Sequence, residues 1–200
     1  QLLTEKPITW QGSLRAPLVD ADVFPKTENG LKAWVGVGGT PESVVRAARY
    51  GYGLMLAIIG GPAGRFRPFV DLYHRSLDSF GRDRLPVGVH SPGHIAETDQ
   101  QAWDEAYEGF ESMNNTIGRE RGWPPYSRMR FQHDVGPEGA LYVGSPETVA
   151  RKIADTVRTL GVTRFDMKFS TGTLSHEKMM RSIELYGTQV QPLVRDILSS

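Results

Sequence analysis

The sequence contains no cysteine among its 200 residues, so disulfide bonds, thiolate metal sites and cysteine nucleophiles are excluded. Its 23 basic and 23 acidic residues cancel to a formal net charge of zero, whereas nucleic-acid-binding proteins carry a positive excess. The longest uninterrupted apolar run, residues 54–59, is far shorter than the roughly 18 residues that a membrane span requires. We therefore expect no nucleic-acid partner and no membrane segment.

Targeting signals and common catalytic motifs are missing as well. The N-terminus does not begin with Met and lacks the charged and apolar regions of a signal peptide, so we expect a cytoplasmic protein whose true beginning is absent from this chain. Glycine-rich nucleotide fingerprints, the Gly-x-Ser-x-Gly turn and metal-binding histidine spacings do not occur. His90 and His94 are four residues apart, but the proline and glycine between them argue against a shared helix face. We predict no metal site, although His90, at the end of a predicted strand, can still face a ligand.

The chain does contain a repeated alternation of short apolar runs and helical patterns. Continuous apolar runs alternating with helices are typical of parallel strands covered on both faces. The four predicted strands are residues 32–38, 54–59, 86–90 and 165–169, and the predicted helices are residues 41–50, 66–77, 99–113, 146–160 and 177–198. The sequence therefore predicts a single α/β domain over residues 1–200, with an irregular start over residues 7–30.

One long connection interrupts this alternation. Between residues 114 and 141 both periodicities fail, and glycines and prolines recur. Connections of this length inside compact domains are usually functional or mobile. We predict an irregular, loosely packed insertion over residues 114–141.

The strongest candidate site is the turn Gly38-Gly39-Thr40, between the first predicted strand and its helix. Glycines let a ligand approach the backbone, and a helix N-terminus directs free N–H groups and a positive dipole toward an anion. Glu42 already satisfies the dipole in the same turn, so the spacing alone slightly favours a structural helix start over a phosphate site.

A second glycine turn, Ile59-Gly60-Gly61, ends the next predicted strand. In parallel α/β folds, ligands collect at the carboxyl ends of strands. Either glycine pair alone merely turns the chain, but two pairs on successive strand ends would form adjacent walls of accessible backbone. Their conjunction favours a ligand site.

A similar helix start recurs later in the chain. Ser145 and Pro146 repeat the arrangement of Thr40 and Pro41, with a hydroxyl residue suited to the N-cap and a proline suited to the first helical position. Shared capping chemistry explains the similarity of the two helix starts more simply than duplication of a structural unit does.

The residues around these turns resemble one known family. The motifs are WVGVGGTPES at residues 34–43, VGSPETVA at 143–150, LGVTRF at 160–165 and RSIELYG at 181–187. In this order and spacing they resemble the bacterial luciferase-like flavin-dependent monooxygenases along nearly the whole chain.

The resemblance implies a (β/α)₈ TIM-barrel fold that binds reduced FMN, or the deazaflavin F420 in some branches. The four predicted strands look like the fifth to eighth of such a barrel, and a complete barrel needs about 250 residues. The resemblance therefore implies a half-barrel, the C-terminal half of a longer protein. It places the cofactor phosphate at Gly38, Gly39 and Thr40, and Ile59, Gly60 and Gly61 beside the cofactor. The Ser145 turn is then structural, and catalytic side chains are expected in the absent N-terminal half.

The function implied is an FMN-dependent monooxygenase that reacts O2 with a small organic substrate and receives electrons from a flavin reductase. An alternative is a non-catalytic flavin- or phosphate-binding half-barrel that needs a partner segment. A different phosphate-binding barrel, such as a sugar-phosphate isomerase or aldolase, would need a lysine or carboxylate at a strand end, for which Lys168 alone is weak support. An open half-barrel exposes strand edges and an apolar face, so we expect a homo-oligomer or a missing complementary segment.

Overall fold

The computed structural model describes residues 2–4 and 6–200. The chain forms two compact units, Gln1–Trp34 and Val35–Ser200, where the sequence predicted a single domain over residues 1–200. Neither a low-complexity tract nor a run of like charge stands near Trp34 to mark the division. The boundary falls instead at the start of a strand, where the composition does not change.

The first unit contains a short 3₁₀ helix, η1 (Leu2–Thr4), and a two-stranded antiparallel sheet of β1 (Ile8–Trp10) and β2 (Leu18–Ala21). The Asp20 N–H donates to the Thr9 hydroxyl at 3.2 Å, next to this pairing. The other described residues before Trp34 form no helix or strand, as predicted for the irregular start over residues 7–30.

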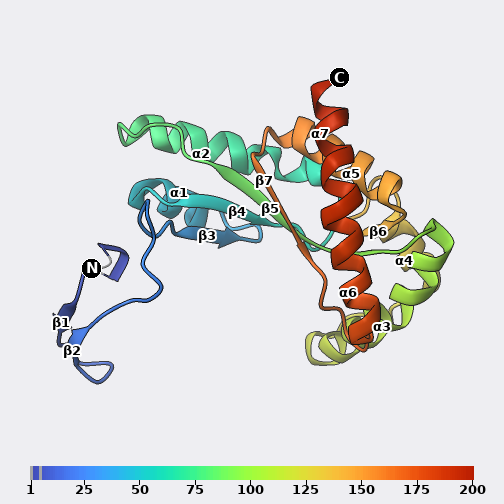
Figure 1. The fold of residues 1–200 in the computed structure, drawn as a ribbon, viewed down its shortest axis with the longest axis horizontal. Coiled ribbons are helices and arrows are strands. Elements are labelled where there is room, and N and C mark those ends of the chain that lie inside the picture. Colours follow the sequence, from blue (N-terminus) through green and yellow to red (C-terminus); the bar gives the residue numbers. More distant parts are fainter. Residues whose placement is uncertain (1, 5) are drawn as a thin grey trace. The chain divides into compact units, whose positions relative to one another are not determined.

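The second unit is built on a five-stranded sheet with the order β3-β4-β5-β6, in which β7 also pairs with β5 (Figure 1). The strands are β3 (Trp34–Val37), β4 (Gly53–Ala57), β5 (Val87–Ile95), β6 (Tyr142–Gly144) and β7 (Arg164–Lys168). Because β4, β6 and β7 all run parallel to β5, the predicted α/β class with a parallel sheet is confirmed. The sequence missed β6, since three residues are too few to show a periodic pattern.

β5 is the central strand of the sheet. Its first half pairs with β4 and β7, which places Ala57 and Asp166 in register with His90. Its last residues pair with β6, where Gly93 lies opposite Tyr142. β5 therefore extends past the end of β4 toward the side on which the strand-end loops lie.

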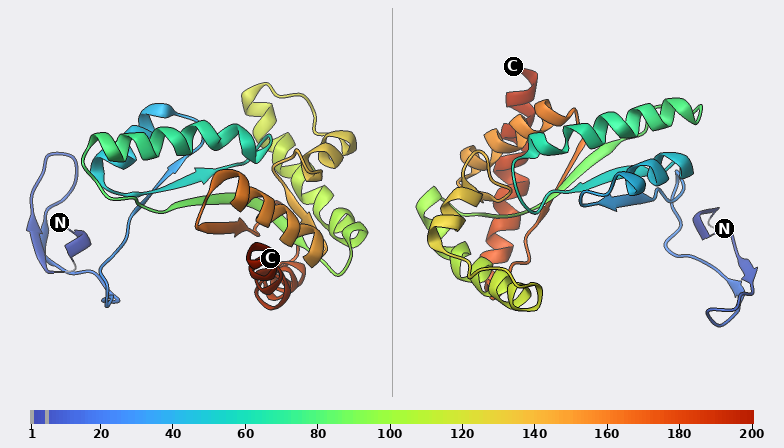
Figure 2. Two further views of the ribbon diagram at one scale, coloured as in Figure 1. Left: turned by 90° about the horizontal axis from the view of Figure 1, so that it is seen from above. Right: turned by 180° about the vertical axis from the view of Figure 1, so that it is seen from behind.

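Helices alternate with the strands along the chain in the order expected for crossover connections (Figure 2). They are α1 (Pro41–Tyr50), the short 3₁₀ helix η2 (Ala63–Phe66), α2 (Arg67–Ser79), α3 (Asp99–Arg121), α4 (Arg128–Val135), α5 (Pro146–Leu160), α6 (His176–Leu185), the π-helical segment η3 (Tyr186–Val190) and α7 (Gln191–Ser199). The last three form one continuous rod, as the single helix predicted over residues 177–198 required (Figure 1).

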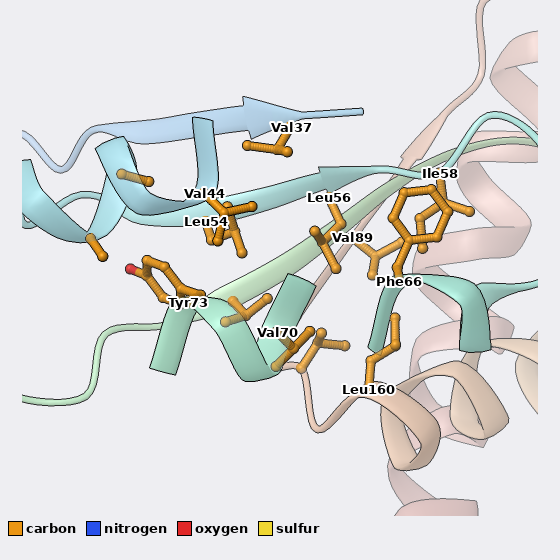
Figure 3. Close-up of a cluster of buried hydrophobic side chains, with 14 of the residues drawn as sticks. Val37, Val44, Leu54, Leu56, Ile58, Phe66, Val70, Tyr73, Val89 and Leu160 are labelled. Carbon is orange, nitrogen blue, oxygen red and sulfur yellow. The ribbon is translucent and has the colours of Figure 1, made fainter. Parts of the chain in front are cut away.

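The main hydrophobic core lies between the sheet and helices α1 and α2 (Figure 3). Alternate residues of β4 and the residue just after it, Leu54, Leu56 and Ile58, are fully buried on this side. Each such side chain stabilises the fold by about 1.5–3 kcal/mol when withdrawn from water. Tyr73 on α2 is also fully buried, and its hydroxyl donates to the Tyr52 carbonyl oxygen at 2.6 Å.

The segment over residues 114–141 is not the irregular insertion that the sequence predicted. Its first part is the end of α3, and α4 occupies much of the remainder. Phe131 of α4 is buried against Tyr107 and Phe110 of α3, with ring centroids 5.5 and 5.9 Å away. The segment is therefore packed onto the fold, and the prediction of a loosely packed insertion is wrong.

Two physical features explain why hydrophobic periodicity did not predict these helices. The last turns of α3 carry almost no apolar stripe, since Ile117 is exposed and the buried residue beside it is Gly118. α4 is only eight residues long and buries Phe131 and Val135 alone. In the described part of the chain, no helix combines the length and the hydropathy needed to cross a membrane.

Candidate functional site

The turn at residues 38–40 leaves its backbone accessible. Gly38, Gly39 and Thr40 are exposed, although Val37 just before them is buried. Gly39 has φ +140°, a conformation that L side chains rarely adopt, and a Cβ atom on Gly38 or Gly39 would meet no atom within 4 Å. The turn thus exposes its backbone to solvent in front of α1.

The N-terminus of α1 also has hydrogen-bonding capacity to spare. Among the described residues, no N–H donates to the Thr40 hydroxyl, and Pro41 has no N–H to offer. The Thr40 carbonyl accepts from the Ser43 N–H at 3.0 Å, which fixes the first turn of the helix. The Arg46 guanidinium donates to the Ser43 hydroxyl at 3.0 Å and brings a positive charge to the same end.

The similar helix start at Ser145 is already occupied by a carboxylate from the chain itself. Asp99 accepts from the Ser145 N–H at 2.6 Å and from the Thr148 hydroxyl at 3.1 Å. Partial burial would raise the pKa of Asp99, but the hydrogen bonds from Ser145 and Thr148 outweigh it and lower the pKa. An incoming anion therefore has no room at α5, whereas the N-terminus of α1 is open.

The second predicted turn, residues 59–61, follows β4. The Ile58 N–H donates to the His90 carbonyl at 3.0 Å, and the Ser91 hydroxyl donates to the Ile58 carbonyl at 2.9 Å. After this anchor the chain leaves the core, and the Ile59 side chain is 72% exposed. Gly60 faces open space, and Gly61 has φ +73°.

Both glycine turns follow the ends of neighbouring strands. β3 and β4 are adjacent in the sheet and are joined through helix α1, a connection typical of parallel strands. The two turns therefore belong to one edge of the sheet, as the sequence predicted for strand ends. That they hold a cofactor stays a prediction.

The face of the sheet opposite the main core carries polar side chains next to these turns. Because strand side chains alternate, His90, Asp166 and Lys168 lie on this face, and His90 is in register with Asp166. The Arg164 guanidinium donates to the Asp166 carboxylate at 2.8 Å. The sequence singled out His90 and Lys168 separately, and only the strand pairing brings their strands together.

The sequence argument weighed His94 only as a metal ligand and missed its pairing with α3. His94 is 1% exposed, and its Nε2 lies 2.8 Å from the Glu105 carboxylate of α3. Burial lowers the pKa of His94, and the hydrogen bond and charge of Glu105 oppose this only in part. No sequence signal pairs these two residues, because Glu105 lies on a helix whose docking is a tertiary event.

The residues present fit the phosphate of a flavin, since the accessible backbone at Gly38 and Gly39 and the open start of α1 are the features that bind phosphate. Among the described residues, no group of three or more His, Asp or Glu side chains could hold a metal ion. The turns also supply no side chain suited to acid–base chemistry, so they can bind and orient a cofactor without themselves transferring protons.

Comparison with solved structures shows the fold that this arrangement belongs to. A monooxygenase, RslO1, from Streptomyces bottropensis matches 96% of this chain and 57% of its own, with 20% identity and a TM-score of 0.71. The oxygenating constituent of 3,6-diketocamphane monooxygenase from Pseudomonas putida, in complex with FMN, matches 96% and 59%, with 15% identity and a TM-score of 0.66. A coenzyme F420-dependent tetrahydromethanopterin reductase from Methanopyrus kandleri matches 96% and 59%, with 19% identity and a TM-score of 0.57.

The chain thus spans less than two thirds of the length of these structures, which are luciferase-like barrel proteins, and its fold is a truncated form of theirs. No curated protein matches the sequence. The family model of the luciferase-like monooxygenases, however, matches residues 1–164. This chain belongs to the luciferase-like monooxygenase family.

Proposed function

We propose that the chain is the C-terminal part of a flavin-dependent monooxygenase, which uses reduced FMN and O2 to oxidise a small organic substrate. The observation that carries this proposal is the contrast between the two helix starts. Asp99 fills the N-terminus of α5, whereas the N-terminus of α1 follows an exposed Gly38-Gly39 backbone and an uncapped Thr40.

In this proposal, residues 38–40 bind the cofactor phosphate through backbone N–H groups and the Thr40 hydroxyl. The positive end of the α1 dipole and the charge of Arg46 favour the dianion, while Glu42 in the first turn opposes it. Binding therefore depends on close approach to the backbone, which only glycine permits at residue 39.

Residues 59–61 take the second role, lining the cofactor next to the phosphate. The exposed Ile59 side chain offers an apolar surface that a flat ring can cover, and Gly60 leaves room for it. The bound flavin supplies the electrons that activate O2. The contribution of the chain is to orient the cofactor and to exclude water from it.

A titration of the 200-residue chain with oxidised and then anaerobically reduced FMN, followed by flavin fluorescence, tests the phosphate assignment. Gly39→Asp places a side chain and a negative charge where the phosphate lies, so we expect the affinity to fall by about tenfold or more. Gly81→Asp is the matched control, because Gly81 is exposed, has φ +62° and faces open space far from the turn in sequence.

Equal affinities of wild type and Gly39→Asp would remove the phosphate from this turn. If the wild-type chain binds no flavin while the complete protein does, the alternative gains support: a half-barrel whose site needs a partner segment. Because the chain spans 57% of the RslO1 structure, the titration is made with both the 200-residue chain and the complete protein.

The choice of cofactor and electron donor is a further part of this proposal. The similar structures include one in complex with FMN and one that depends on F420, so the same titration is run with F420. Oxidation of reduced FMN by the complete protein, with a free flavin reductase as donor, would separate a monooxygenase from a non-catalytic flavin-binding protein.

A further inference from the structure

A cavity of about 720 Å³ lies among η2, α4 and α5, and its lining begins at Pro62, directly after the turn at residues 59–61. One wall is formed by residues 62–65, the other by one face of α5, and the connection before β6 closes it. The described residues that line it include none of residues 38–40 or 59–61. Its volume lies within the range of about 300–1,000 Å³ that small-molecule sites occupy.

The inner part of this cavity is aromatic and apolar. Tyr142 and Val135 are buried there, and Trp103 of α3 is half-buried at the same wall. The Tyr142 hydroxyl is already paired with the Thr156 hydroxyl at 2.7 Å, and its ring is covered by Lys152 and Phe165, so Tyr142 closes the inner end of the cavity and the Trp103 ring is left to meet a ligand. These surfaces suit a flat apolar molecule.

Lys152 also lines the inner part but has no donor left for a ligand. Its ammonium group donates to the carbonyl oxygens of Val135, Gly136 and Leu141 at 3.2, 2.6 and 2.8 Å. It can attract an anion by its charge, and the hydrogen bonds to that anion must come from other residues.

Those donors stand at the rim. Arg65 on η2 and Arg151 on α5 are exposed and line the cavity from its two walls. In the part of the chain that the structure describes, neither guanidinium makes an ion pair or a side-chain hydrogen bond. Guanidinium groups bind planar anions in a two-pronged geometry, and both arginines keep their hydrogen-bond donors available for that task, although the charge of Arg151 also helps to lower the pKa of Asp99.

Two carboxylates, Glu138 and Asp155, share the rim. Three basic and two acidic side chains leave the lining with a net charge of +1, and Lys152 puts positive charge at the apolar end. The balance favours a single negative charge on the ligand, and Glu138 reduces the affinity for it.

We propose that this cavity is a binding site for a small organic anion with a flat apolar body, separate from the flavin site. The anionic group lies between Arg65 and Arg151, and the apolar body lies against Trp103. The lining includes none of the residues of the strand-end turns, although Arg65 lies next to Gly61, so the site is argued from its own lining and not from the proposed function.

The test uses two fluorescent probes of nearly the same shape, the anionic 8-anilinonaphthalene-1-sulfonate and the neutral N-phenyl-1-naphthylamine. Replacing both arginines, Arg65→Gln with Arg151→Gln, removes charge-assisted hydrogen bonds, so the affinity for the anionic probe is expected to fall by about tenfold. The affinity for the neutral probe should change by less than about twofold. Arg75→Gln on α2 is the matched control, an exposed arginine that does not line the cavity.

Two single variants locate the probe. Thr159→Trp, at an exposed rim position beside Gly64, should block both probes, and Glu138→Gln should strengthen the anionic probe alone. The proposal is overturned if wild type binds neither probe, if Thr159→Trp leaves both affinities unchanged, or if the arginine pair weakens both probes equally. It is also overturned if Arg75→Gln matches the loss caused by the arginine pair.

Discussion

Asp99 shows how one carboxylate can make two similar helix starts chemically different. The residue begins α3, yet its side chain reaches across to the first turn of α5 and satisfies Ser145 and Thr148 there. At α1, no carboxylate from elsewhere in the described chain plays this part for Thr40. Similar helix starts in the sequence therefore lead to one closed and one open helix terminus.

We predict that Asp99→Asn lowers the free energy of unfolding at pH 7 by about 1–2 kcal/mol, because it removes a charge that two donors stabilise. A carboxyl group whose pKa is lower in the folded state stabilises the fold fully above its ordinary pKa of 3.8. That contribution is lost as the pH falls below 3.8 toward the lowered value. Urea unfolding at pH 7 and pH 3 should therefore show the difference between wild type and variant shrinking in acid.

Asp104→Asn provides the control for this measurement, since Asp104 is an exposed carboxylate on the same helix that accepts from Gln100. Its effect should stay within about 0.5 kcal/mol. If the free energies of unfolding of wild type and Asp99→Asn differ by the same amount at pH 7 and at pH 3, the charge of Asp99 does not stabilise α5.

At the scale of single residues, the sequence predicted the positions whose role is local. Gly39 and Thr40 stand beside the helix they precede, so their exposure follows from the order of strand, turn and helix. His94, Glu105 and Asp99 owe their roles to contacts between elements far apart in the chain. No periodicity or spacing marks such contacts.

The connection between α4 and β6 illustrates how an element can be held by a side chain from its neighbour. Lys152 of α5 donates to three carbonyl oxygens at and beyond the end of α4, where the helix leaves carbonyl groups without partners. Burial lowers the pKa of Lys152 to about 8, so the charged amine is held there at some cost in desolvation.

We predict that Lys152→Met lowers the free energy of unfolding by about 2–4 kcal/mol, since three carbonyl groups lose a charged donor at once. Hydrogen exchange should become faster over residues 135–141 in particular. Lys178→Met is the control, because Lys178 is exposed and lies 4.0 Å from Glu105, an interaction worth about 1 kcal/mol at most. Equal destabilisation by both variants would contradict the special role of Lys152.

At the scale of elements, long amphipathic helices and continuous apolar strands were predicted correctly. α1, α5, β4 and β7 lie within a few residues of their expected positions. α4 and β6 were missed because each is short and is stabilised by contacts with α3 and α5 rather than by its own pattern.

At the scale of the whole molecule, the five-stranded sheet has an unpaired strand edge. One edge of β7 pairs with β5. Within the described residues, no strand pairs with the other edge of β7. On the sheet face opposite the main core, Met55 and Ala57 of β4 are half-buried, and Ile59, just after the strand, is exposed to solvent. Exposed edges and apolar faces of this kind favour association with another chain or segment.

We predict that the 200-residue chain self-associates unless a complementary segment is supplied. Light scattering coupled to size-exclusion chromatography over a range of concentrations should give a mass above the 22.2 kDa of one chain. Adding a segment that pairs with the same edge should lower the self-association, because the edge is then covered. A monodisperse monomer at every concentration would contradict this prediction.

The sequence by itself determined the α/β class, the parallel sheet, the family and the two glycine turns, because each depends on local order along the chain. Hydrophobic runs, caps and glycines act within a few residues of their own position. Only the tertiary structure decided which helix N-terminus stays open, which cations line a cavity without a partner, and where residues 114–141 pack. These depend on the docking of distant elements, where a single contact such as Asp99 to Ser145 changes what a site can bind.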